Sequence, residues 1–319
     1  MEKVGMEAII ERCAGIDVHE RTVVVCALKG DLKKKPEKEI ETFNTTTTDL
    51  LKLLYWIEER GCTQVAMEST GVYWKPVWNV LESGDFEMIL ANARHIKNLP
   101  GRKTDVKDAE WIAQLLRSGL INKSFVPDAH IRDLRDITRY RKKILYELNR
   151  EKNRVHKILE DCNIKISSYI SDIFGDTGRK ILNKIINQEE IRMTDLIEIS
   201  NGRGKASIRK KLGEIKEAVN GKVRKHHLTM IKYTYNHIRF LEEQVVQIEK
   251  EISEYIEPYF EEVEIIDTIP GINKNAASVI IAEIGTDMGY FPTDKHITSW
   301  AGLSPGNCES AGKKKEVKQ

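Results

Sequence analysis

The sequence has 319 residues, which is enough for about two domains. Hydrophobic residues make up 40% of it, a share that supports packed cores and excludes a wholly disordered chain. The net charge is only +2, no apolar run approaches the roughly 18 residues of a membrane span, and no apolar segment follows Met1 as in a signal peptide. We therefore expect a cytoplasmic protein with no membrane partner.

The small net charge hides blocks of opposite sign. Lys and Arg outnumber Asp and Glu by 10 to 5 across residues 132–160 and by 10 to 2 across residues 201–232, whereas residues 241–264 hold nine Glu and one Lys. Separate basic blocks indicate a polyanionic partner such as nucleic acid, and the acidic block excludes a uniformly basic surface. The five cysteines have no metal-type spacing and fit reduced thiols.

The N-terminal third predicts a mixed α/β sheet. Short apolar or β-branched runs predict strands, and apolar residues at helical spacing predict helices between them. The sequence of strands first in a meander and then alternating with helices is typical of a mixed sheet. The expected strands are 12–18, 22–28, 38–43, 64–68 and 87–91, and the expected helices are 48–59, 72–81 and 104–118.

Four acidic residues in this region are candidate metal ligands. Asp17 and Glu68 each fall at or near the end of an apolar strand, and Asp105 and Asp108 share one face of the first turn of a helix that Thr104 is expected to cap. If the two strands are neighbours and the helix closes over them, four carboxylates meet and can hold two Mg²⁺ ions. The alternatives are strand-end acids that reach solvent and helix acids that favour the helix dipole.

Three segments that carry these acids closely resemble one family. They are residues 14–19 (AGIDVH), 67–74 (MESTGVYW) and 103–109 (KTDVKDA). All three resemble the DEDD transposases of the insertion-sequence one-ten family, the bridge-RNA-guided recombinases. The resemblance implies a RuvC-like, ribonuclease-H-type fold and assigns Asp17, Glu68, Asp105 and Asp108 to the metal-binding tetrad. It also implies a guide RNA, for which we see no motif, and a nucleoid-associated place in a bacterial or archaeal cytoplasm.

The middle of the chain is expected to be helical. Residues 131–160 predict a long basic helix, which either lies along a nucleic-acid backbone or presents an ordinary solvated face. A second long helix is predicted by apolar and aromatic residues that recur at alternating steps of three and four and form a coiled-coil seam. These residues are Ile238, Leu241, Val245, Ile248, Ile252, Tyr255 and Tyr259. The partner of this seam is either the first helix folded back antiparallel or the same helix of a second subunit, or the helix simply packs on a domain. The family resemblance favours a dimerising coiled-coil arm.

Residues 161–227 are less readable. Residues 181–186 and 208–219 look helical, 201–205 looks like an exposed basic loop, and 221–227 is also basic. His226 and His227 are adjacent, so we expect their side chains to point apart and not to form a metal site.

The C-terminal segment predicts short helices around a Pro-Gly turn at residues 270–271, which looks like a helix-hairpin-helix element. Residues 300–305 and 308–312 complete the pattern of the family's C-terminal transposase domain, and Ser310 falls on its nucleophilic serine. Ser304 is the nearby competitor, and Cys308 is expected to be an incidental thiol. The family continues past this serine through a further basic helical segment, whereas this chain ends at Gln319, so we expect the domain to be incomplete.

We therefore predict an α/β RuvC-like catalytic domain over 1–127, a helical coiled-coil region with a basic insertion over 128–262, and a small all-α C-terminal transposase domain over 263–319. The predicted function is a DNA transposase that cuts and rejoins duplex DNA with Mg²⁺ and Ser310, as a homo-oligomer. The alternatives are a RuvC-like junction nuclease in which water is the nucleophile, and a truncated, non-catalytic remnant that only binds nucleic acid.

Overall fold

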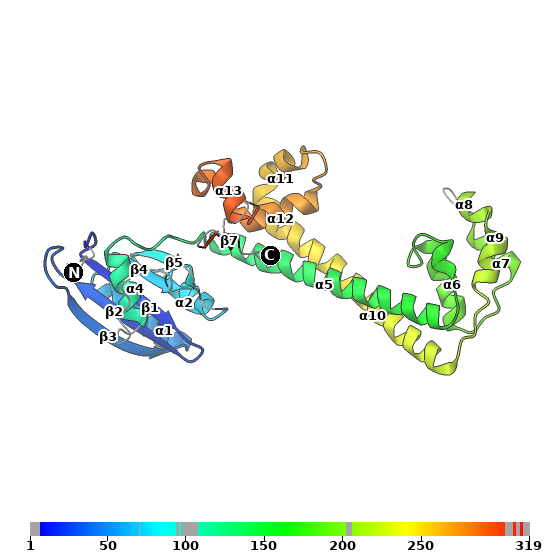
Figure 1. Cartoon of the computed structure of the whole chain (residues 1–319), viewed down its shortest axis with the longest axis horizontal. Coiled ribbons are helices and arrows are strands. Elements are labelled where there is room, and N and C mark those ends of the chain that lie inside the picture. The colour runs from blue at the N-terminus through cyan, green and yellow to red at the C-terminus, as the bar shows by residue number, and fades with distance from the viewer. Residues whose placement is uncertain are drawn as a thin grey trace. The chain divides into compact units, whose positions relative to one another are not determined.

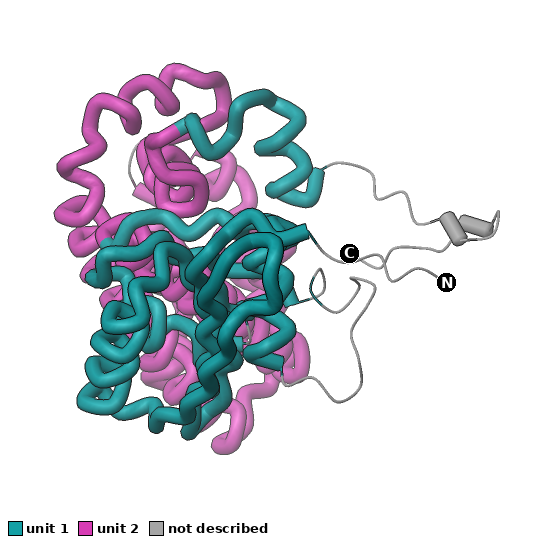
Figure 2. Tube along the Cα trace, turned by 90° about the vertical axis from the view of Figure 1, so that its left-hand side faces the viewer, with its two compact units in different colours: residues 1–129, 288–319 teal, residues 130–287 magenta. Residues whose placement is uncertain are grey.

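The protein is described here by a computed structural model that covers residues 7–69, 71–93, 96, 108–201, 206–303, 309–310 and 313–314. The chain divides into two compact units, residues 1–129 with 288–319 and residues 130–287 (Figure 2). Each unit has its own buried apolar residues and is described separately below. The three-part division expected from the sequence stays a prediction.

The first unit is built on a five-stranded mixed sheet with the strand order β3-β2-β1-β4-β5 (Figure 1). Strands β1, β2 and β3 form an antiparallel meander, and β4 and β5 continue the sheet parallel to β1. The predicted mixed α/β domain is therefore confirmed. The strands are β1 (Arg12–Val18), β2 (Thr22–Lys29), β3 (Glu37–Asn44), β4 (Gln64–Glu68) and β5 (Glu87–Ala91).

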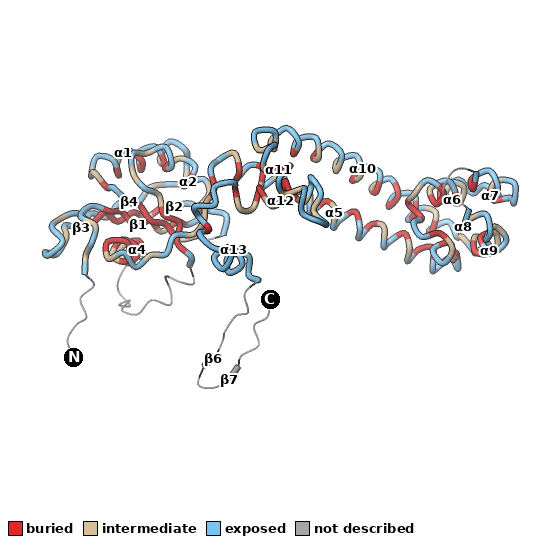
Figure 3. Tube along the Cα trace, turned by 90° about the horizontal axis from the view of Figure 1, so that it is seen from above, coloured by how far each residue is buried: buried red, intermediate tan, exposed pale blue. Residues whose placement is uncertain are grey.

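Helices cover both faces of this sheet (Figure 3). Helices α1 (Thr47–Glu59) and α2 (Trp74–Leu81) pack on the face that carries Ile16, Val25 and Met67. Helix α4 (Asp108–Arg117) packs on the opposite face, against Cys13, Cys26 and Ala66. The central strands are apolar at nearly every position because both of their faces are buried.

The unit also contains the chain's last described helices. Phe125, which follows the sheet, lies 5.2 Å from Phe291 and 6.1 Å from Trp300 between ring centroids. These rings join the segment after α4 to η3 (Met288–Tyr290) and α13 (Asp294–Trp300). Residues Glu309–Ser310 (β6) and Lys313–Lys314 (β7) pair antiparallel, so the expected all-α C-terminal segment is wrong at this point.

The second unit is organised by two long antiparallel helices, α5 (Ala129–Asp161) and α10 (Lys225–Ile256). His130 Nε2 lies 2.8 Å from the carbonyl oxygen of Tyr255 at one end, and Asp161 Oδ2 lies 2.6 Å from His227 Nε2 at the other. The predicted seam faces this contact, since Ile238, Leu241, Ile248 and Ile252 are buried in a core shared with α5. Of the alternatives left open by the sequence, pairing with the first helix inside the same chain is confirmed.

Shorter helices complete the second unit. One helix was predicted over 208–219, but two are present, because the chain turns at Lys210 and Lys211. No described helix is both long enough and apolar enough to cross a membrane. The remaining elements are η1 (Ile166–Ser168), α6 (Asp176–Ile186), α7 (Met193–Ile199), α8 (Ala206–Arg209), α9 (Leu212–Ala218), η2 (Glu257–Tyr259), α11 (Phe260–Asp267) and α12 (Lys274–Ile284).

Candidate active site

Asp17 and Glu68 lie side by side at one edge of the sheet. Strands β1 and β4 are parallel neighbours, with Ile16 paired to Met67, and each strand ends within two residues of that pair. Asp17 and Glu68 each come one residue after this pair, so they lie at the same edge of the sheet. The sequence posed the neighbourhood of these two strands only as a condition, and the sheet meets it.

Helix α4 carries Asp108 toward this edge because it packs closely on β1. A Cβ atom on Gly15 would lie 2.2 Å from the backbone nitrogen of Ala113 and 2.4 Å from the carbonyl oxygen of Ala109. Only glycine permits backbones to approach this closely. The Sγ of Cys13 also lies 3.6 Å from the carbonyl oxygen of Ala113. Asp108 begins the helix at the end of β1 that holds Asp17.

The pKa of Asp17 shows that Glu68 and Asp108 lie close enough to affect its carboxyl group. Burial raises the pKa of the Asp17 carboxyl group, and the charges of Asp108 and Glu68 raise it further, while His19 lowers it. His19 Nε2 lies 3.1 Å from Asp17 Oδ2. The net shift is upward, so burial and like charge outweigh the favourable histidine. The site is thus a cluster of negative charge in which Asp17 and Glu68 are half-buried and Asp108 is exposed.

The donor set of this cluster fits a divalent metal. Carboxylate oxygens are the ligands that Mg²⁺ prefers, and a cation would offset the repulsion that raises the pKa of Asp17. The carboxylate oxygens of the described residues, however, do not all lie close enough to one another to share one ion. Asp17, Glu68 and Asp108 do not form a group whose potential ligand atoms all lie within 4.8 Å of one another. Shared coordination of one ion by all three therefore requires a change of side-chain rotamers.

Two predicted site residues fall outside this geometry. Asp105, with its expected cap Thr104, lies outside the described residues, as do Ser304 and Cys308. Ser310 is described only as a backbone position in β6, paired with Lys313. The roles of Asp105 and Ser310 therefore stay predictions.

The expectation that His226 and His227 point apart is wrong. Their ring centroids lie 3.9 Å apart, and with Asp161 they form a group whose potential ligand atoms lie within 4.8 Å of one another. His227 is buried and fully engaged: its Nδ1 accepts the backbone N–H of Arg224, and its Nε2 lies 2.6 Å from Asp161 Oδ2. This arrangement caps the first turn of α10 and ties it to the end of α5. A local structural role therefore accounts for the cluster.

Two residues that support the site were missed by the sequence reasoning. Gly15 had a readable signal, because a glycine inside an apolar strand often marks a close backbone approach. Arg117 had none, because its partners are distant in sequence. Its buried guanidinium donates to the carbonyl oxygens of Glu11, Gly30 and Asp31 at 3.0, 3.1 and 2.9 Å. Arg117 thus fixes the far end of α4 against β1 and the β2–β3 turn.

Several of the basic side chains of α5 form ion pairs or hydrogen bonds with other residues of the same unit. Arg139 makes two bonds of 2.7 Å to the Glu283 carboxylate, and Arg135 donates to the carbonyl oxygens of Ala282 and Glu283. Arg141, Lys152 and Arg154 also pair with glutamates. Apart from Arg154, which pairs within α5, these cations hold α10 and α12 against α5, so much of the predicted basic stripe is engaged inside the unit.

Comparisons with known proteins agree with the arrangement of motifs. A sequence model of the DEDD transposases of the IS110 type matches residues 14–164, and a model of the transposase IS116/IS110/IS902 family matches residues 263–319. None of the curated proteins matches the chain. Solved structures similar to it include Thermus thermophilus RuvC, alone and in complex with a Holliday junction substrate. Both are 13% identical with a TM-score of 0.27, and they cover 35% and 36% of this chain and 99% of their own.

Proposed function

Because the chain belongs to the IS110 family of DEDD transposases, we propose that it cuts and rejoins DNA strands at the sheet edge that carries Asp17, Glu68 and Asp108. One observation carries the proposal. Three acids from β1, β4 and α4 come close enough that two of them raise the pKa of the third. A carboxyl group whose pKa is raised by burial and by nearby carboxylates marks a candidate functional site, since such a group lowers stability.

We assign Asp17, Glu68, Asp105 and Asp108 as the ligands of divalent metal, with Mg²⁺ bound as two ions. Ions held there would stabilise the attacking and leaving oxygens of a phosphodiester. The chain's own part is to fix the carboxylates. Gly15 lets α4 lie against β1, and Arg117 holds the other end of the helix.

Ser310 is the proposed nucleophile. Its hydroxyl oxygen forms a bond to the phosphorus of a DNA phosphodiester, and the 3′ oxygen leaves and takes up a proton. The released 3′-hydroxyl later attacks a joined partner strand. A serine hydroxyl needs a base to act in this way, and the carboxylates at the sheet edge, of this chain or of a second copy, are the candidate bases.

The proposed partners are duplex DNA, a guide RNA and a second copy of the chain. The paired helices α5 and α10 leave large apolar side chains in solvent, including Phe240 at 53% and Val246 at 62% exposure. Such side chains support a homo-oligomer formed along this arm. The Pro-Gly turn between α11 and α12, with Gly271 at φ +91° and Asn273 capping α12, supports a hairpin that faces phosphate.

The test is strand cleavage of duplex DNA in Mg²⁺, measured with the DNA that flanks the gene as substrate and with and without RNA transcribed from that flanking DNA. Glu68→Gln and Asp108→Asn should each lower cleavage by about 100-fold or more, the loss typical of removing one electrostatic stabiliser. Glu59→Gln, an exposed acid at the end of α1, is the matched control and should cleave normally.

Ser310→Ala separates the two parts of the proposal. The wild-type chain should leave a covalent protein–DNA adduct on a denaturing gel, and Ser310→Ala should leave none. If Ser310→Ala still cleaves, water is the nucleophile and the serine assignment is wrong. If Glu68→Gln and Asp108→Asn both cleave at the wild-type rate, the carboxylate site is wrong.

A further inference from the structure

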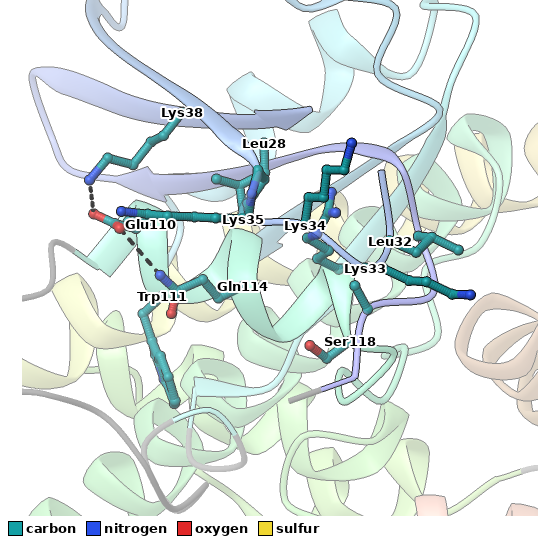
Figure 4. A pocket seen from close by; sticks show the side chains of 13 residues that line it. Leu28, Leu32, Lys33, Lys34, Lys35, Lys38, Glu110, Trp111, Gln114 and Ser118 are labelled. Atoms are coloured by element: carbon teal, nitrogen blue, oxygen red, sulfur yellow. Dashed lines mark hydrogen bonds and ion pairs between the residues drawn. The ribbon is translucent and has the colours of Figure 1, made fainter. Parts of the chain in front are cut away.

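A second candidate site lies in the first unit, between the turn that joins β2 to β3 and one face of α4 (Figure 4). It is a cleft of about 840 Å³. Its charged lining residues are Lys33, Lys34, Lys35, Lys38, Arg117 and Glu110. Asp108 and Arg117 stand at opposite ends of α4, so the cleft extends away from the carboxylates along the helix.

The cleft carries a positive charge that its own residues leave unbalanced. Lys38 Nζ lies 2.9 Å from Glu110 Oε2, so this pair is neutral. In the described part of the chain, no carboxylate lies within ion-pair distance of the side chains of Lys33, Lys34 or Lys35. Arg117 is bonded to three neutral carbonyl groups, which leaves its charge in place. Four cations therefore face one cleft without a matching acid in its lining.

The lysines stand on a turn whose backbone is held in place. Lys33 donates its backbone N–H to Asp31 Oδ1 at 2.8 Å, and the N–H of Lys34 reaches the carbonyl oxygen of Asp31 at 3.2 Å. Arg117 bonds the same carbonyl oxygen from α4. A fixed turn loses little conformational entropy when a ligand binds, whereas a loose lysine loop would lose more.

The exposure of the side chains points to a polyanion rather than to a small buried ligand. All four lysines of the cleft are exposed, and their side chains point in different directions instead of converging on one point (Figure 4). Lysine is a flexible point charge that suits successive phosphates along a chain. From Glu110 to Arg117, the part of α4 that lines the cleft rises about 10 Å, which spans about three nucleotide steps of one strand.

We propose that this lysine cleft binds the sugar–phosphate backbone of a nucleic acid. The ligand chemistry is a run of phosphodiesters, which duplex DNA, single-stranded DNA and RNA share. The inference goes beyond the proposed cutting function, because binding here uses neither the carboxylates nor Ser310. Binding therefore persists in EDTA, where cleavage stops.

The test is equilibrium binding of the whole chain, in EDTA, to fluorescent duplex DNA, single-stranded DNA and RNA of one sequence, measured over a range of salt. A triple variant, Lys33→Gln, Lys34→Gln and Lys35→Gln, should bind at least one of these about tenfold more weakly at low salt. Each lysine–phosphate contact contributes about 0.9 to the slope of log K against log salt for a duplex, so the slope should fall by roughly 2 to 3.

The matched control removes the same charge elsewhere. Lys52, Lys123 and Lys250 are exposed, and each already pairs with a carboxylate, so their triple Gln variant should bind like the wild type. Arginine at positions 33, 34 and 35 should preserve binding. The nucleic acid whose affinity falls most identifies the occupant of the cleft. Equal affinity and equal salt slope of the two Gln variants for all three nucleic acids would overturn the proposal.

Discussion

At Asp17, burial and two neighbouring carboxylates raise the pKa of the carboxyl group. An acid with a raised pKa in the folded state binds its proton more tightly there than in the unfolded chain, so its ionisation lowers the free energy of unfolding. Without divalent metal, this contribution to stability should decline as pH rises from the ordinary value of 3.8 through the raised folded-state value. Asp17→Asn should therefore raise the melting temperature at pH 7 in EDTA, as followed by circular dichroism.

Mg²⁺ should reverse the sign of the effect. An ion that binds only the folded wild-type chain adds stability by mass action, about 2.7 kcal/mol at a hundredfold excess over its dissociation constant. It should raise the melting temperature of the wild type and of Asp85→Asn, an exposed acid outside the site, much more than that of Asp17→Asn. An equal rise in all three would mean that the ion binds elsewhere.

At the scale of elements, the contact between β1 and α4 decides whether Asp108 reaches Asp17. In Gly15→Ala, the new methyl group meets backbone atoms of α4 at 2.2 and 2.4 Å, so the helix must move. Overpacking usually costs 1–3 kcal/mol, and because backbone cannot rotate away we expect roughly 3 kcal/mol here. Urea denaturation measures the loss, and Mg²⁺-dependent cleavage should fall with it.

Gly213→Ala is the matched control, since nothing lies within 4 Å of the added methyl group and the residue stands in α9. Alanine in an open helical position should gain about 0.5–1 kcal/mol. If both variants unfold at the same urea concentration, the close approach of α4 to β1 does not limit stability.

These elements also show what local sequence can and cannot predict. Strands β1, β4 and β5 begin and end as predicted, because each is a continuous apolar run buried on both faces. The approach of Gly15 to Ala113 and the bonds from Arg117 to the β2–β3 turn join residues far apart in sequence. No local period encodes such contacts, so they had to come from the structure.

For the candidate site, too, the sequence predicted positions along single elements but not the contacts between distant ones. The sequence showed two strands that each end at or near an acid, but only the strand pairing of the structure shows that Asp17 and Glu68 lie at the same edge. The lysine cleft was not predicted, because its lysines and Arg117 come together only when the β2–β3 turn meets α4. The seam of α10 was predicted from spacing, but spacing alone left open whether it packs on the first helix, on a second subunit or on a domain.

At the scale of the whole molecule, the two units have separate cores. The sheet and its helices bury Leu53 at 0% exposure in the first unit, and the α5–α10 pair buries Ile238 at 0% in the second. Units with their own cores can unfold independently. We expect two transitions in scanning calorimetry, with the Mg²⁺-dependent one belonging to the unit that holds Asp17.

Alanine substitutions assign the transitions. Leu53→Ala and Ile238→Ala each remove a fully buried side chain, which typically costs 2–5 kcal/mol. Leu53→Ala should lower the midpoint of the Mg²⁺-dependent transition alone, and Ile238→Ala that of the other. A single transition that both variants lower equally would show that the units fold as one cooperative body. In that case Mg²⁺ bound at the sheet edge would also stabilise the helical arm.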